Sequence, residues 1–152
     1  MDNLNEILLV EDDPRDVRLT VHVIQTAYPK KKISVVRDGQ EALDFIFCRE
    51  AYSSRSLAQP PKIVLLDLKL PKVDGIQVLR EMKARSETRA IPVVVLTSSR
   101  EEKDMVESYR LGVNSYIQKP VDFESFQETI KTLGLYWLSV NQPPPEKAFV
   151  ED

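Results

Sequence analysis

Polar residues follow directly after the most apolar segments of the chain, and their types could support chemistry. Three acids, EDD (11–13), follow ILLV (7–10), and Asp67 follows IVLL (63–66). A carboxylate at the end of an apolar segment is costly unless it stays hydrated, pairs with a cation or binds a metal. These acids are therefore the first candidates for a functional site.

Hydroxyl groups and a lysine follow two further apolar segments. TSS (97–99) comes after VVVL (93–96), and Lys119 comes after SYIQ (115–118). If the acids lie together, each raises the pKa of the others, and they stay ionised only with cations among them. Lys119 supplies one positive charge. A hard divalent cation with oxygen ligands, Mg²⁺ rather than Ca²⁺ and with Mn²⁺ as an alternative, would supply the rest.

This combination of groups favours phosphoryl transfer. A carboxylate such as Asp67, beside Mg²⁺ and a lysine, can attack phosphorus and become an acyl phosphate. The cations would neutralise the transferring oxygens, and the Thr97 hydroxyl would donate a hydrogen bond to one of them.

The elements that must position these residues alternate between strand and helix patterns. The segments ILLV, IVLL and VVVL, and ISVV (33–36) with its single serine, are short and do not alternate between apolar and polar residues, as in strands covered on both faces; SYIQ is a weaker fifth segment. Between them, apolar residues recur at helical spacing: Val17, Val21 and Ile24; Ala42, Leu43, Ile46 and Phe47; Val78, Leu79 and Met82; Met105, Val106 and Tyr109, ended by Gly112. This (βα)₅ order predicts a doubly wound parallel sheet that binds ligands at the carboxyl ends of its strands.

A long last helix is predicted over 123–140, with Asp122 as its N-cap. Its apolar stripe comprises Phe123, Phe126, Ile130, Leu133, Trp137 and Val140. Leu135 and Leu138 lie off this stripe, so the end of the helix is apolar on more than one face, which is typical of an interface. We expect a homodimer through this helix and the face of the fourth helix, with these candidate contacts: Tyr109, Phe123, Trp137 and Leu138.

The composition is that of a soluble globular domain. The chain has 152 residues, a net charge of −3, one cysteine (Cys48) and one histidine (His22), so it can form no intrachain disulfide and we expect no His-based metal site. No apolar run approaches the length of a membrane span and no signal peptide is visible, so we expect a cytoplasmic protein that binds neither nucleic acid nor membrane. The predicted domain covers 1–140, followed by a proline-rich acidic tail over 141–152 in polyproline II form.

Four segments in order, LLVEDDP, IVLLDLKLPKVDG, VVVLTSS and SYIQKP, closely resemble the receiver domain of two-component response regulators. The resemblance covers about residues 5–135. It implies a flavodoxin-like fold with strand order 2-1-3-4-5, and a signalling protein rather than an enzyme. Such a protein accepts a phosphoryl group from a histidine kinase and catalyses only its own phosphorylation and dephosphorylation.

The resemblance also implies a role for individual residues. Asp67 resembles the phosphoacceptor. The implied metal ligands are Glu11, Asp12, Asp67 and the backbone carbonyl of Lys69, and the implied phosphoryl-binding residues are Thr97, Ser98 and Lys119. Thr97 and Tyr116 resemble the switch pair, in which Tyr116 turns into space that the Thr97 hydroxyl vacates. Asp13 matches no ligand of the family and is interpreted as the cap of the first helix.

The EDDPRD start, the long segment 49–62 and the tryptophan in the last helix resemble the small regulators paired with phytochrome-type histidine kinases. We therefore expect a stand-alone regulator whose kinase could be of that type. Output would pass through protein contacts, or the protein would act as a phosphorelay shuttle or phosphate sink. Segment 49–62 is either a spacer or a docking surface.

Other protein classes on a similar sheet fit less well. A haloacid-dehalogenase-type phosphatase requires a second acid two residues after its nucleophile, and that position is Lys69. A flavin or nucleotide carrier would require a glycine-rich loop after a strand, and the four glycines form none. A receiver-like protein that is never phosphorylated would not need the combination of the acids at 11–13 with Asp67, Thr97 and Lys119.

Overall fold

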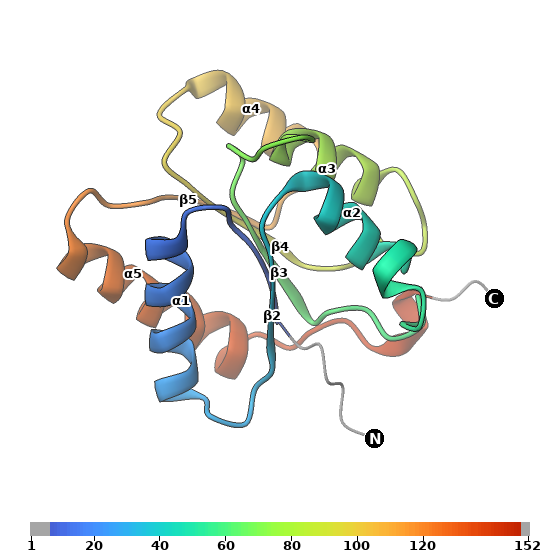
Figure 1. Ribbon diagram of the computed structural model, residues 1–152, viewed down its shortest axis with the longest axis horizontal. Coiled ribbons are helices and arrows are strands. Elements are labelled where there is room, and N and C mark those ends of the chain that lie inside the picture. The colour runs from blue at the N-terminus through green and yellow to red at the C-terminus, as the bar shows by residue number, and fades with distance from the viewer. Residues whose placement is uncertain (1–6, 150–152) are drawn as a thin grey trace.

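In the computed structural model, which describes residues 7–149, a parallel five-stranded sheet lies between two layers of helices (Figure 1). The strands are β1 (Ile7–Val10), β2 (Ile33–Val36), β3 (Ile63–Leu66), β4 (Val93–Thr97) and β5 (Ser115–Gln118). Their order is β2-β1-β3-β4-β5, with all pairs parallel. The predicted doubly wound fold and its strand order are confirmed.

The central strands β1, β3 and β4 are buried on both faces, whereas the edge strands β2 and β5 are mostly half-buried, and this explains why the central strands are the most apolar. Successive side chains of a strand point to opposite faces. Leu8 and Leu66 accordingly join one apolar cluster, with α2 and α3, whereas Ile7 and Leu65 join a second cluster with α1 and α5. The central strands therefore need apolar residues on both faces.

Helices α1 (Pro14–Ala27) and α5 (Phe123–Leu135) cover one face, and α2 (Gly39–Ile46), α3 (Gly75–Lys83) and α4 (Glu102–Arg110) lie on the other (Figure 1). Four of these helices begin at an aspartate whose side chain accepts a hydrogen bond from the first turn: Asp13, Asp38, Asp74 and Asp122. The predicted caps of the first and last helices are thus confirmed. No described helix has the length and apolar character to cross a membrane.

The fourth helix departs from its predicted burial. Val106 and Tyr109 of the expected apolar stripe are exposed, and Ser108 is the buried residue of α4. The spacing correctly predicts a helix, but α4 lies at the margin of the molecule, where half of such a stripe meets solvent (Figure 1).

The last helix is regular only to Leu135 and continues as a wider π-helical turn over Tyr136–Val140. Phe126, Ile130 and Leu133 are buried as predicted, whereas Phe123 and Val140 at the two ends of the stripe are exposed.

The chain after α5 packs against the domain. It passes below the sheet to the side of α2 (Figure 1), forms a short 3₁₀ turn over Glu146–Phe149, and inserts Phe149 into the α2–α3 apolar cluster. Phe149 is 9% exposed. The first six and last three residues of the predicted domain and tail lie outside the described residues.

Segment 49–62 is also packed rather than extended. Tyr52, in a 3₁₀ turn over Glu50–Tyr52, donates a 2.8 Å hydrogen bond to Glu41 of α2, and its ring centroid lies 4.9 Å from that of Phe45. The Arg55 guanidinium stacks 3.8 Å from the centroid of the Phe45 ring. The segment therefore covers the end of α2.

Candidate functional site

The backbone ladder extends one residue beyond the central strands and places two acids side by side. The amide of Glu11 donates to Val36 at 3.0 Å, and the amide of Asp67 donates to Val10 at 3.0 Å. Glu11 and Asp67 are thus fixed at the carboxyl edge of the sheet, 3% and 5% exposed. Asp12, the next residue, is exposed.

Glu11, Asp12 and Asp67 form one acidic cluster, in which each contributes a carboxylate oxygen within 4.8 Å of the others. Burial, together with the charge of Asp67, raises the pKa of Glu11 to about 8, against the opposing effect of Lys119. Closely spaced hard oxygen donors that repel each other are suited to a divalent cation such as Mg²⁺ or Mn²⁺. The donor set therefore fits the metal expected from the sequence.

Lys119 brings a buried ammonium group into this cluster. Its backbone amide is fixed by a 2.7 Å bond to the Thr97 carbonyl. Its Nζ donates to Glu11, to Asp67 Oδ2 at 3.1 Å and to Asp16 Oδ2 at 2.9 Å. Burial disfavours the charged form, but the charge of Asp67 and the bonds to Asp16 and Glu11 outweigh burial and raise the pKa of Lys119. The lysine therefore stays charged beside the acids.

The turn after β3 holds the other oxygen of Asp67. The amide of Lys69 donates to Asp67 Oδ1 at 3.2 Å, and the amide of Gly75 donates to the Leu68 carbonyl at 2.9 Å. A Cβ on Gly75 would lie 2.3 Å from the Asp67 carbonyl oxygen. Only glycine lets the start of α3 approach this closely.

The hydroxyl groups of Thr97, at the end of β4, and of Ser99 form another side of the site. Thr97 is fully buried, and its Oγ1 accepts the Ser99 amide at 3.2 Å. Ser99 Oγ donates to Asp104 Oδ2 at 2.6 Å, and Lys69 Nζ lies 3.4 Å from the same oxygen. The hydrogen bond from the Ser99 hydroxyl and, to a smaller extent, the interaction with Lys69 hold the pKa of Asp104 below its usual range. This network joins the β3–α3 turn to the start of α4.

The Tyr116 hydroxyl is buried beside Ser99, but no hydrogen bond of normal geometry joins it to Ser99 or to another described residue. Burial raises the pKa of this hydroxyl. The hydroxyl therefore already points inward although the side chain is half-buried, and the ring centroid lies 6.4 Å from that of the exposed Tyr109.

Two pockets open at the cluster. One, of about 320 Å³, is lined by Asp12, Lys69 and Asp104. The other, of about 790 Å³, lies between α1 and the start of α5 and includes Ser98 and Lys119. The predicted metal-binding and phosphoryl-binding residues thus lie around one region, with Ser98 on its exposed rim.

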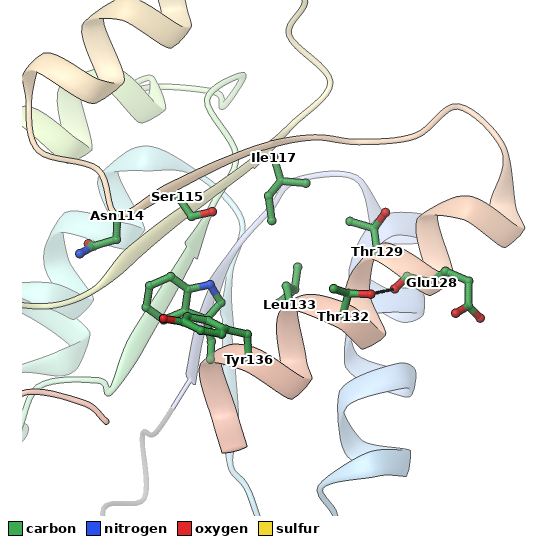
Figure 2. A pocket seen from close by; sticks show the side chains of 9 residues that line it. Asn114, Ser115, Ile117, Glu128, Thr129, Thr132, Leu133 and Tyr136 are labelled. Atoms are coloured by element: carbon green, nitrogen blue, oxygen red, sulfur yellow. Dashed lines mark hydrogen bonds between the residues drawn. The ribbon is translucent and has the colours of Figure 1, made fainter. Parts of the chain in front are cut away.

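A third hollow, of about 570 Å³, lies away from the acidic cluster and shares no lining residue with it. It lies between β5 and α5, with Ile117 on one side and Thr132 and Tyr136 on the other (Figure 2). The Thr132 hydroxyl donates to the Glu128 carbonyl at 3.0 Å, the bond drawn there. Among residues 7–149, Glu128 is the one charged residue in its lining, so this hollow offers little chemistry.

The predicted dimer contacts differ in exposure. Tyr109 and Phe123 are exposed, whereas Trp137 and Leu138 are half-buried against the α1–α5 cluster. At the end of the last helix, the exposed apolar residues are Leu135, Tyr136 and Val140.

Sequence reasoning did not single out Asp16 or Asp104. Each lies in the first turn of a helix, where an acid is expected because it complements the helix dipole. Their contacts with Lys119 and Lys69 depend on the fold, and the sequence carries no separate signal for them.

The fold and this site define a signalling receiver domain: residues 7–131 match the model of the response regulator receiver domain family, and the chain belongs to that family. It is 43% identical to the probable methanogenesis regulatory protein FilR2 of Methanothrix harundinacea, over 91% of this chain and 86% of that protein. It is 38% identical to response regulator Rcp1 of Synechocystis sp., over 87% and 88% of the two chains.

Two solved structures are also close to this fold. The Mn²⁺-bound form of Rcp1 has a TM-score of 0.87 at 37% identity and covers 91% of this chain and 98% of its own. The phosphorylated cyanobacterial phytochrome response regulator RcpA has the same TM-score and identity, over 93% and 99%. The protein is thus a response regulator with phytochrome regulators among its relatives.

Proposed function

We propose that Asp67 is the phosphoacceptor of this response regulator. The observation that carries the proposal is the buried Asp67 carboxylate. It accepts a 3.1 Å hydrogen bond from Lys119 Nζ and lies within the acidic cluster. An Asp67 oxygen attacks the phosphorus of a kinase phosphohistidine. The phosphorus–nitrogen bond breaks, the histidine nitrogen keeps the electron pair, and an acyl phosphate forms.

Residues around Asp67 stabilise the transferred group. Lys119 donates to a phosphoryl oxygen, and the Thr97 hydroxyl, which now accepts the Ser99 amide, has its own proton available for another. Ser98 lies on the rim, where its hydroxyl can reach the same group.

Glu11, Asp12, Asp67 and the Lys69 carbonyl would hold Mg²⁺ or Mn²⁺, with Glu11 acting through water. When bound, the cation neutralises negative charge that accumulates on the transferring oxygens. The acidic cluster and the Mn²⁺-bound form of the relative Rcp1 support this assignment.

Thr97 and Tyr116 would carry the signal. When the Thr97 hydroxyl turns to the phosphoryl group, it releases the Ser99 amide, and the bond from Ser99 to Asp104 transmits this change to α4. Tyr116, which is half-buried with its hydroxyl already inside, would fill the space that the Thr97 hydroxyl vacates. Phosphorylation would therefore change the surface of α4, β5 and α5.

The test is incubation with acetyl phosphate and Mg²⁺, followed by intact mass. The wild-type protein gains one phosphoryl group and Asp67→Asn gains none. Asp74→Asn is the matched control, because it makes the same chemical change at a nearby helix cap that an asparagine can still serve. A phosphoryl adduct on Asp67→Asn would refute the assignment.

The phosphoryl donor would be a histidine kinase of the phytochrome type. This proposal is supported by RcpA, which is described as a phytochrome response regulator. Transfer should be faster from such a kinase than from one of an unrelated sensor class, measured with radiolabelled kinase at equal concentrations. Equal rates would contradict the pairing.

A homodimer would form through the α4, β5 and α5 surface. Tyr109, Leu135 and Val140 are exposed there, and Tyr136 lines the hollow of Figure 2. Sedimentation of the wild type and of Leu135→Ser at tens of micromolar, with and without acetyl phosphate, tests this. A wild type that is monomeric in both conditions would contradict it.

A further inference from the structure

The Lys119 ammonium has an acceptor outside the acidic cluster, namely Asp16. This residue lies in the first turn of α1, and its Oδ2 accepts from Lys119 Nζ at 2.9 Å. The side chain is 23% exposed, on the side of the pocket between α1 and the start of α5. Asp16 therefore reaches Lys119 from the face opposite Lys69 and α4.

Asp16 differs from the other two acceptors in what else it can bind. Glu11 and Asp67 belong to the cluster whose oxygens converge within 4.8 Å, and Asp16 does not. A cation in that cluster would draw on Glu11 and Asp67, and phosphorylation would consume one oxygen of Asp67. Neither event engages Asp16, so it can keep its bond to Lys119 throughout.

The donors of Lys119 are fully used before phosphorylation. Each N–H of an ammonium group serves one acceptor, and those of Lys119 serve Glu11, Asp16 and Asp67. A phosphoryl oxygen must replace one of these acceptors. Phosphorylation weakens Asp67 as an acceptor and a cation weakens Glu11, so Asp16 is the acceptor that remains.

We propose that Asp16 is a positioning residue for phosphoryl transfer, which anchors the Lys119 ammonium while its other donors move to the phosphoryl group. This inference rests on the proposed function of Asp67. Asp16 itself touches neither the phosphoryl group nor the cation and acts through Lys119.

The test compares Asp16→Asn with Asp13→Asn. Both remove one negative charge from the start of α1, but the Asp13 side chain caps the helix at the Arg15 amide, 2.9 Å away, and pairs with Arg15, whereas Lys119 Nζ bonds Glu11, Asp16 and Asp67. Phosphorylation by acetyl phosphate is followed by intact mass at saturating Mg²⁺. We expect Asp16→Asn to react about five- to tenfold more slowly, because the amide oxygen can still accept from Lys119 but the bond loses its charge assistance. Asp13→Asn should react at the wild-type rate.

Three further measurements separate positioning from a structural role. Mg²⁺ affinity, measured by calorimetry, should be unchanged in Asp16→Asn. Asp16→Glu should recover most of the rate. On a Lys119→Met background, Asp16→Asn should cause no further loss, because the two residues act as one unit.

Several outcomes would overturn the inference. An unchanged or faster rate in Asp16→Asn, an equal loss in Asp13→Asn, or an undiminished effect on the Lys119→Met background would each do so. If the wild type forms no adduct, the proposed function fails along with the inference. If the wild type reacts and Asp67→Asn does not, a wild-type phosphorylation rate in Asp16→Asn refutes this inference and leaves the proposed function intact.

Discussion

Replacing Gly75 with alanine should disturb the phosphoacceptor by pushing on the backbone beneath it. A Cβ at this position would lie 2.3 Å from the Asp67 carbonyl oxygen and 2.6 Å from Leu68 Cα. The first contact must open by about 0.7 Å even to reach 3.0 Å, and both partners are backbone atoms. Either α3 moves outward or the end of β3, with Asp67, shifts.

The expected effect has two parts. Forcing an extra carbon into a close-packed site costs about 1–3 kcal/mol of unfolding free energy. A displacement approaching 1 Å at a reacting group can slow a reaction by about a hundredfold. We therefore expect Gly75→Ala to lower the urea midpoint and to slow phosphorylation of Asp67 by about ten- to a hundredfold.

Gly134→Ala is the matched control. It also replaces a helical glycine, so the change in the unfolded chain is the same. Its Cβ would meet the nearest atom, in Tyr28, at an ordinary 3.7 Å. Alanine in a helix interior is favoured over glycine by about 0.5–1 kcal/mol, so this variant should be as stable as the wild type or more so, and react normally.

Urea unfolding and the acetyl phosphate reaction, followed by intact mass, measure both parts on the same samples. If Gly75→Ala matches Gly134→Ala in stability and in rate, the close approach of α3 to β3 is not needed to position Asp67, and the reasoning fails.

Three other predictions follow from the described contacts. Tyr116→Phe should leave the urea midpoint unchanged or raise it, because the buried hydroxyl has no well-formed hydrogen bond to any residue of 7–149; a loss above about 1 kcal/mol would mean that the hydroxyl is bonded after all. Phe149→Ala should cost about 2 kcal/mol, and removal of residues 141–152 should cost the same, since Phe149 anchors that segment; an unchanged midpoint in both would contradict the anchoring. Because the pKa of Glu11 is raised to about 8, the folded metal-free protein binds a proton that the unfolded chain releases at lower pH. Its unfolding free energy should therefore fall as the pH rises from about 5 to 8 in EDTA, and the slope should flatten in Glu11→Gln; an identical slope would refute this.

The site was predictable where its chemistry lies at strand ends. Apolar segments identify the strands, their parallel order brings the carboxyl ends together, and Asp67 and Lys119 each come directly after one of them. Asp16 and Asp104 were missed for a physical reason: an acid in the first turn of a helix is already explained by local electrostatics. Their bonds to lysines arise only from the packing of distant segments.

Burial was harder to predict than secondary structure. The periodicity over 105–109 identifies α4 but not its exposed position at the margin of the sheet. Phe149 lies among prolines and charges that favour a solvated tail, yet it is buried because the fold leaves an apolar surface beside α2. Such surfaces are made by several segments, and no single one of them carries the signal.

The anchoring of the site in the sheet ladder has a consequence for its motions. The amides of Glu11, Asp67 and Lys119 are bonded to neighbouring strands, so their deuterium exchange should require opening of the sheet itself. The side of the acidic site that these three residues form is therefore as rigid as the interior of the domain. The more flexible side of the site is formed by the loops that carry Asp12, Lys69 and Ser98. Sequence changes in those loops would alter the rates of phosphorylation and dephosphorylation while the reacting groups stay in place.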